Sequence, residues 1–210
     1  ACEGDYDTFH RQRRESAHIF RKHGGVCLGT GPGRSFQEAK FDFPHVRDYL
    51  MDRGVMGDVS ETSTTWNNLI PMYKATLAAI EKAIRNTGMD PWVGCHISHN
   101  YHTGASLYFT FGCRQIVGRE MEQYLYIKKA AEDAFMTIGG TVSHHHAVGC
   151  EHLPWIEEDI SPAGMKAVKA LKDGLDPKGV MNPGKIIPGE DPLEEWGLTE
   201  EAIQSFNKAD

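Results

Sequence analysis

Residues 92–113 read WVGCHISHNYHTGASLYFTFGC. Trp92–Tyr101 and Ala105–Cys113 are rich in aromatic and β-branched residues, and the turn-forming residues His102–Gly104 separate them. This pattern predicts two strands joined by a turn. Because side chains alternate along a strand, Tyr108 should face the side opposite to Phe109 and its neighbour Phe111. We therefore expect Phe109 and Phe111 in the core and Tyr108 on the other face of the sheet.

The segments on either side of this hairpin predict alternating strands and helices. Val55–Glu61 reads as a strand, and Thr64 or Thr65 is expected to cap the helix that follows it. A second helix over Met121–Ile138 should end at Gly139-Gly140, and the next residues should form a strand. The resulting order is β-α-β-β-α-β, a ferredoxin-like α+β fold with an antiparallel sheet and helices packed on one face. The apolar stripe of the first helix comprises Trp66, Leu69, Tyr73, Leu77, Ile80 and Ile84.

Both ends of the chain predict helical segments. An N-terminal helix should stop at Gly24-Gly25, a short strand should follow at Val26–Leu28, and Gly29–Gly33 should form a flexible loop. Ser161-Pro162 predicts the start of a C-terminal helix, with Ser as N-cap and Pro in the first turn. The basic run Arg11–Arg14 fits a solvated helix face.

The composition excludes several classes of protein. The chain has 210 residues, 40% of them hydrophobic, and a formal net charge of −7, so it lacks the basic footprint of a nucleic-acid-binding protein. No apolar stretch reaches the roughly 20 residues of a membrane span. The five cysteines form no CxxC pair, which favours buried free thiols in a reducing compartment. They are Cys2, Cys27, Cys95, Cys113 and Cys150.

The run GGTVSHHHAVG at residues 139–149 points to chemistry, because imidazole exchanges protons near neutral pH and binds metals. In a regular strand, His144 and His146 would share one face and could form a zinc pair. The other histidines that could add ligands are His96, His99 and His102. The alternative is one buried histidine and two exposed ones, but three in a row favour a site.

Two further side chains are candidates. The phenol of Tyr108 suits proton transfer if it faces a pocket near the histidines. Arg47 would by default form an ion pair, for example with Asp48, but its guanidinium also suits a phosphate or a carboxylate.

Together these motifs resemble the alkyldihydroxyacetonephosphate synthases, which are flavoproteins of the vanillyl-alcohol oxidase superfamily. The histidine run is similar to their G-G-x-x-S-H-H-H-x-V-G signature, and Asp176–Lys185 resembles the D-P-x-x-x-x-N-P-G-K tail of many FAD-linked oxidases. The resemblance implies that residues 1–160 are a cap domain that forms the substrate pocket. It implies that residues 161–210 are a helix and tail returning to an FAD-binding domain outside this chain. We therefore expect a fragment that binds FAD poorly by itself.

The resemblance also implies roles for individual residues. Tyr108, His145 and His146 are expected to be catalytic, Arg47 and His144 to bind substrate, and Asn182 to contact FAD, with no metal. The implied reaction exchanges the acyl group of acyl-dihydroxyacetone phosphate for a fatty alcohol in ether lipid synthesis. The alternatives are an FAD-dependent oxidase or dehydrogenase of a hydroxy acid or alcohol, and a histidine-rich metal-binding module.

Other expectations concern the setting of the protein. The substrate should be a small lipid-like molecule or a hydroxy acid. We expect a cytoplasmic protein, and leave open both a peripheral association with membranes and a homodimer. The resemblance needs both His145 and His146 near the flavin, so the expected strand should end or bend there.

Overall fold

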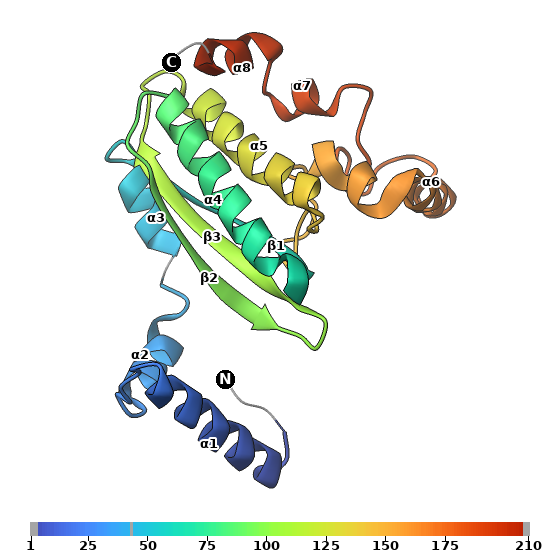
Figure 1. Ribbon diagram of the computed structural model, residues 1–210. Coiled ribbons are helices and arrows are strands. Elements are labelled where there is room, and N and C mark those ends of the chain that lie inside the picture. Colours follow the sequence, from blue (N-terminus) through green and yellow to red (C-terminus); the bar gives the residue numbers. More distant parts are fainter. Residues whose placement is uncertain (1–3, 43, 208–210) are drawn as a thin grey trace. The chain divides into compact units, whose positions relative to one another are not determined.

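An antiparallel sheet lies at the centre of residues 47–210, one of two units into which the chain divides (Figure 1). The computed structural model describes residues 4–42 and 44–207. Within this part of the chain, the sheet has three strands in the order β1-β3-β2, so the hairpin predicted for residues 92–113 is confirmed. The strands are β1 (Val55–Thr65), β2 (Trp92–Asn100) and β3 (Gly104–Arg114).

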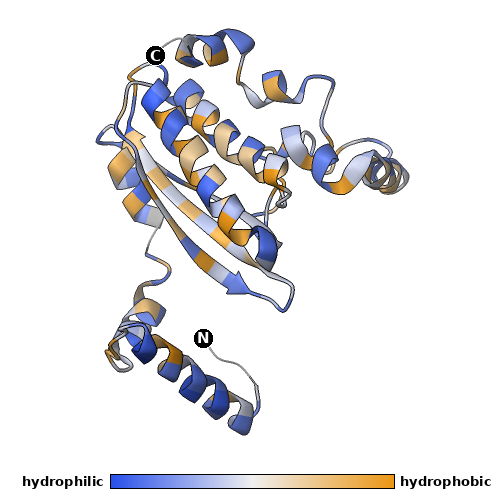
Figure 2. Ribbon diagram, viewed as in Figure 1, coloured by the Kyte–Doolittle hydropathy of each residue, from blue (hydrophilic) through white to orange (hydrophobic). Residues whose placement is uncertain are grey.

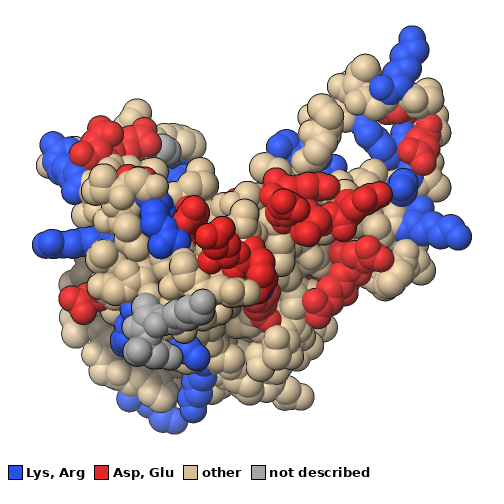
Figure 3. Space-filling view, turned by 90° about the horizontal axis from the view of Figure 1, so that it is seen from above, with Lys and Arg blue, Asp and Glu red and all other residues tan. Residues whose placement is uncertain are grey.

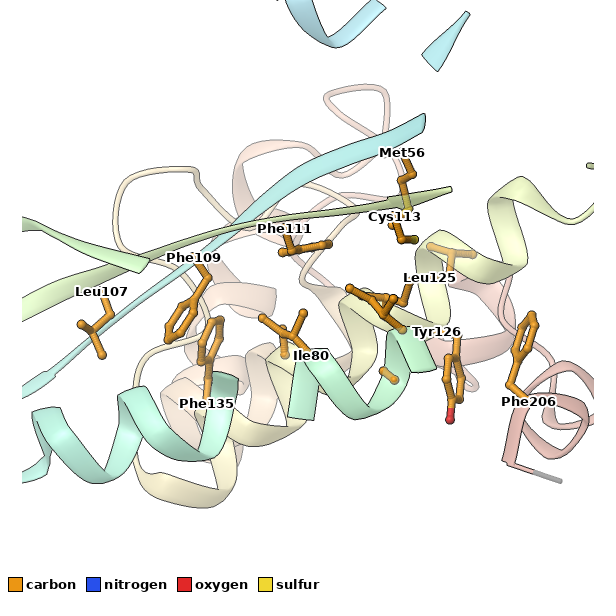
Figure 4. Close-up of a cluster of buried hydrophobic side chains, with 14 of the residues drawn as sticks. Met56, Ile80, Leu107, Phe109, Phe111, Cys113, Leu125, Tyr126, Phe135 and Phe206 are labelled. Atoms are coloured by element: carbon orange, nitrogen blue, oxygen red, sulfur yellow. The ribbon is translucent and has the colours of Figure 1, made fainter. Parts of the chain in front are cut away.

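Two long helices, α4 (Leu69–Asn86) and α5 (Glu120–Ile138), cover one face of this sheet (Figure 1). Phe109 and Phe111 are fully buried beneath them, as Figure 4 shows. Hydrophobic and hydrophilic residues alternate along both helices in Figure 2, and the buried apolar ones join the core cluster, because burying such a stripe against a sheet removes it from water. The α+β class, with helices on one face, is therefore confirmed. We call the other side of the sheet the open face; Tyr108 lies there, as alternation predicts.

The fourth strand of the expected ferredoxin-like order is absent from the described residues. After α5, backbone pairing between the described residues and the edge of β1 is limited to Thr141, whose N–H donates to the carbonyl of Ser63 at 3.1 Å. The hydroxyl of Thr62 donates to the carbonyl of Thr141 at 2.7 Å. Residues 141–148 then form bends rather than a strand. The observed order is β-α-β-β-α, and the site described below explains why the pairing stops.

Gly139 and Gly140 end α5 as predicted, and each has a separate reason to be glycine. Gly139 takes a left-handed conformation at φ +81°, which a residue without Cβ adopts readily. Gly140 lies against the sheet edge, where a Cβ atom would be 2.7 Å from Met72 Cε and even nearer to Thr62 Oγ1. The close approach of backbone to sheet therefore depends on Gly140.

We expect Gly140→Ala to lower the free energy of unfolding by about 1–3 kcal/mol, because the added methyl group overpacks the junction. Gly174→Ala in the C-terminal helix is the matched control, since its Cβ would meet nothing within 4 Å. That control should be neutral or stabilising by up to about 1 kcal/mol. Urea denaturation of both variants measures the difference, and equal stabilities would contradict the packing argument.

Two helix boundaries differ from the expectations. β1 continues to pair with β3 through Thr65, so neither Thr64 nor Thr65 caps α4, which begins after the short 3-10 helix η1 (Trp66–Asn68). The C-terminal helix α6 (Ile156–Leu175) begins before Ser161, but it is interrupted there, where φ is +70°. The hydroxyl of Ser161 accepts from the N–H of Gly164 at 3.3 Å, so the predicted cap starts the second half of α6.

The remaining C-terminal elements complete the core. The 3-10 helix η2 (Leu153–Trp155) precedes α6, and the helices α7 (Pro192–Trp196) and α8 (Glu200–Asn207) follow it. Ala202 and Phe206 of α8 join the buried cluster beside α5. Acidic residues open both α7 and α8, and Figure 3 shows Asp and Glu side chains gathered on the upper side of the molecule.

The unit of residues 1–46 contains α1 (Tyr6–Lys22) and α2 (Gly31–Ala39), and α3 (Pro44–Met51) begins at its end. Val26–Leu28 is not a strand, which corrects the prediction. Its side chains Val26 and Leu28 are exposed, and no strand of this unit's described residues lies beside them. The loop expected at Gly29–Gly33 is also shorter, because a proline in the first turn starts α2 at Gly31.

Candidate active site

A row of polar side chains crosses the open face of the sheet. The strand register places Tyr108 of β3 between Glu61 of β1 and His96 of β2. The rings of His96 and Tyr108 are 5.0 Å apart. Glu61 is only 1% exposed, although it carries a carboxyl group on the face without long helices. Something must therefore cover Glu61 and stabilise its charge.

The histidine run covers Glu61. Its Oε1 atom accepts the backbone N–H groups of three successive residues: His144 at 3.2 Å, His145 at 2.5 Å and His146 at 2.9 Å. Successive N–H groups of a strand point in opposite directions, whereas here three converge on one anion, as in the concave backbone nests that bind anions. This is the physical reason why the expected strand is replaced by a bent loop, which we call the histidine loop (residues 143–149).

The loop bends at the histidines, as the resemblance predicted, so the side-chain alternation of a regular strand does not apply to them. His144 Nε2 lies 2.8 Å from the hydroxyl of Tyr101, and its Nδ1 lies 3.0 Å from Nδ1 of His145. His145 Nδ1 is also 2.8 Å from Glu61 Oε2, and the ring of His146 is 5.5 Å from the ring of Tyr108. The structure thus brings together His144, His145, His146 and Tyr108.

The surroundings shift the pKa values of several groups in this cluster. Burial raises the pKa of Glu61, but the N–H groups of His145 and His146 outweigh it and hold the pKa below its usual value. Burial lowers the pKa of His146 and of His144, so both rings are biased toward the neutral form. Burial and then the charge of Glu61 raise the pKa of Tyr108, so its phenol keeps its proton at neutral pH. The site therefore combines a phenol that can donate a proton with imidazoles that can accept one.

The same cluster offers two sets of metal-ligating atoms. Those of His99, His144 and His145 lie within 4.8 Å of one another, as do those of Glu61, His145 and His146. Of the histidines expected to assist, His99 is thus near the loop, whereas His102 contributes only a backbone carbonyl to Trp66. In the second set, Oε1 of Glu61 is already occupied by three backbone N–H groups.

Arg47 and Asn182 lie outside this cluster. The helix α3 packs on the open face, where Leu50 Cδ1 would be 4.0 Å from a Cβ atom added to Gly57. Arg47 precedes Leu50 by about one turn of α3, is exposed, and forms no ion pair within the described residues, Asp48 included. Asn182 lies in an exposed turn at φ +46°, and no hydrogen bond joins it to the described histidines.

Cys95 and Cys113 contribute no activated thiol to the site. Burial raises the pKa values of the Cys95 and Cys113 thiols to about 11, so these side chains stay protonated. Cys27 and Cys150 are free but exposed, which corrects the expectation that the thiols are buried. Cys2 lies outside the described residues.

The comparison with protein families decides the assignment. Residues 3–186 match the family described as FAD linked oxidases, C-terminal domain. The chain belongs to this family. Its members are FAD-dependent enzymes, and the resemblance of the chain to the FAD-linked oxidases is confirmed. No helix of the described residues is long and apolar enough to cross a membrane.

Individual relatives in this family are also similar to the chain. It is 34% identical over 203 residues to the alkyldihydroxyacetonephosphate synthase of Trypanosoma brucei brucei, covering 97% of this chain and 33% of that protein. It is 36% identical over 170 residues to the enzyme of the same name from Dictyostelium discoideum, covering 81% of this chain and 28% of that protein. The chain thus spans about a third of the length of these relatives.

A solved structure agrees with these comparisons. The structure of alkyldihydroxyacetonephosphate synthase in P212121 aligns with a TM-score of 0.59 and 28% sequence identity, covering 85% of this chain and 29% of that chain. The chain is also 26% identical over 148 residues to an uncharacterised FAD-linked oxidoreductase, YgcU, of Escherichia coli strain K12, covering 69% of this chain and 30% of that protein.

Sequence reasoning missed two residues of the site. Glu61 was predicted only as the last residue of a strand, yet it organises the loop from 83 to 85 residues away in the chain. Its only local signal is a carboxylate within the Ser- and Thr-rich strand Val55–Thr65. Tyr101, which contacts His144, was assigned to the strand end without a role.

Proposed function

We propose that this chain is the substrate-side domain of a flavoenzyme of the alkyldihydroxyacetonephosphate synthase type. The observation that carries the proposal is the histidine loop, folded around Glu61 so that His146 lies against Tyr108. In the proposed reaction, the C1–O bond of acyl-dihydroxyacetone phosphate breaks and releases a fatty acid. The oxygen of a fatty alcohol forms the new bond to C1, giving the ether-lipid precursor with no net oxidation or reduction.

The side chains on the open face have the polar chemistry needed to lie against FAD. Glu61 Oε2 lies 2.8 Å from Nδ1 of His145, and the His145 side chain is 49% exposed. Phenol and imidazole groups on an otherwise uncovered sheet face are donors and acceptors that match the polar edge of a flavin ring. FAD would lie against His145 and Tyr108, supplying its redox-active ring, and most of its contacts would come from another domain. Asn182 and residues 161–210 are proposed to reach that domain.

The proposed roles of the side chains follow from their chemistry. Proton removal from the carbon next to the ketone needs a positioned base, and departure of the acyl group needs a proton donor. The neutral ring of His146 and the protonated phenol of Tyr108 provide these two functions side by side. His144 and His145 lie in the same cluster and are proposed to contact the substrate. Arg47 on α3 forms no ion pair within the described residues, and its guanidinium suits the phosphate group of the substrate.

The test is an anaerobic exchange assay with the full-length, FAD-loaded protein that contains this chain. Acyl-dihydroxyacetone phosphate and a labelled fatty alcohol should give equal amounts of ether product and fatty acid, and the flavin spectrum should be oxidised again after turnover. Bleaching of the flavin by a 2-hydroxy acid, without ether formation, would instead assign an oxidase or dehydrogenase. Stoichiometric zinc or iron held by the histidines would favour the metal-binding alternative.

A further inference from the structure

The residue that follows His146 in the histidine loop has a strained backbone conformation. Ala147 has φ +65°, in the left-handed region that residues with a Cβ atom rarely adopt. Such conformations persist when the surrounding structure holds them, and they concentrate at functional sites. The backbone conformation of Ala147 sets the position of the adjacent His146. The groups that hold Ala147 in this conformation are therefore of functional interest.

The group that holds this turn is the imidazole of His152, which is 3% exposed. Its Nδ1 atom lies 2.9 Å from the carbonyl oxygen of Ala147 and 3.2 Å from that of Val148. Because carbonyl oxygens only accept hydrogen bonds, Nδ1 carries the proton and donates to both. The backbone N–H of His152 donates to Val148 as well, at 3.1 Å.

The segment around His152 is itself fixed to α5. The carboxylate of Glu151 lies 3.0 Å from the buried ammonium of Lys128 and accepts the hydroxyl of Tyr124 at 2.5 Å. Lys128 also donates to the backbone carbonyl of Val59 in β1 at 2.6 Å. The histidine loop is therefore held at two points: Glu61 binds its front from the sheet, and His152 binds its rear from a segment anchored on α5.

We propose that His152 is a positioning residue that holds Ala147 in the left-handed conformation and thereby sets the imidazole of His146 against Tyr108. The effect on turnover rests on the proposed function, whereas the effect on the loop does not. His152 touches neither Tyr108 nor the other rings of the cluster among the described contacts, so it acts only through the backbone. A histidine that merely filled core volume would not need its Nδ1 proton.

Two polar replacements of His152 distinguish a positioning role of its Nδ1 proton from simple filling of core volume. In His152→Asn, the side-chain amide takes the place of Nδ1 and can still donate to Ala147. In His152→Gln, the amide takes the place of Nε2, which in the wild type faces the buried Glu132 at 3.7 Å. A third variant, His152→Phe, fills the space but has no donor. Glycine adopts positive φ without strain, so Ala147→Gly should compensate for the loss of the donor.

The first measurement is the NMR spectrum of the histidine rings in the chain labelled with ¹³C-histidine. We expect His152→Gln and His152→Phe to shift or broaden the ring signals of His144, His145 and His146, whereas His152→Asn should keep them. Adding Ala147→Gly to His152→Phe should restore them. Wild-type ring signals in His152→Gln, or no recovery in the double variant, would overturn the proposal. If His152→Phe does not fold, the comparison of the Asn and Gln variants alone decides.

The second measurement is turnover of the full-length, FAD-loaded enzyme. His152→Gln should lower kcat at least about 10-fold with KM within about twofold, and His152→Asn should retain most of the activity. A rise in KM of similar size, with kcat unchanged, would contradict a role of His152 in positioning the His146 ring. If the enzyme proves to be a dehydrogenase, its own substrate replaces the acyl ester in this assay. The NMR result stands in either case, so failure of the proposed function and failure of this inference are distinguishable.

Discussion

Replacing Glu61 by alanine is expected to release the histidine loop and to lower the free energy of unfolding by about 2–4 kcal/mol. The variant loses a buried carboxylate that accepts three successive backbone N–H groups, those of residues 144, 145 and 146. Hydrogen bonds to a charged acceptor are among the stronger ones, and donors left without a partner carry a desolvation cost. Turnover of the full-length enzyme should fall about 100-fold or more, because the rings proposed to be catalytic lose their positions. Urea denaturation and kinetics measure the two effects.

Glu81→Ala is the matched control for this variant. Its carboxylate pairs with Arg85 one turn away on α4, and the two side chains are 35% and 59% exposed, so the change should cost less than about 0.5 kcal/mol. Equal stabilities of the Glu61 and Glu81 variants would show that the loop is held by other contacts.

The stability of the wild type should also depend on pH through Glu61. Its pKa is lowered in the folded state, so its contribution is complete above the ordinary value of 4.5. The contribution is lost as the pH falls from there through the lower folded-state pKa. In Glu61→Gln, which keeps an acceptor oxygen but does not titrate in this range, this part of the acid dependence should disappear.

Tyr108→Phe is expected to lower kcat of the full-length enzyme by about 10²–10⁴-fold, the typical contribution of a positioned proton donor or acceptor. The phenol lies beside the ring of His146, and burial together with the charge of Glu61 raises its pKa, so it holds a proton at neutral pH. The substitution removes only the hydroxyl, so FAD content and stability should remain near the wild-type values. Steady-state kinetics and the flavin absorbance of the purified variant check both points.

Tyr73→Phe provides the comparison for this second variant. Tyr73 lies on α4 and stacks on Phe109, on the opposite side of the sheet from the site. Loss of its hydroxyl should change kcat less than about twofold. A Tyr108→Phe enzyme with wild-type kcat would remove Tyr108 from the catalytic assignment, and loss of FAD or of folding would assign it a structural role.

Local patterns in the sequence were sufficient for most of the fold. The alternation around Phe109 and Phe111 identified the inner face of β3 and placed Tyr108 on the other face. The glycine pair after α5 predicted where that helix ends. These signals work because helix and strand periodicities, and the conformational freedom of glycine, act over a few neighbouring residues.

The candidate site depended on contacts that no local pattern contains. A fourth strand was predicted for the residues that follow the helix stop at Gly139-Gly140. In the structure, Glu61 captures three of their N–H groups from more than 80 residues away, and sheet pairing ends at Thr141. Likewise, the positive φ of Ala147 depends on His152, and nothing about an alanine indicates such a conformation.

By itself, the sequence determined the α+β class, the hairpin and the flavoenzyme family, and it proposed the histidine run as a candidate site. Only the tertiary structure decided that the bend forms around a buried carboxylate, with His146 facing Tyr108 and His152 behind it. The physical reason is that the bend is locally unfavourable, because it gives up backbone hydrogen bonds to the neighbouring strand and strains the backbone. The hydrogen bonds that offset these costs come from groups brought together only when the sheet and α5 have packed.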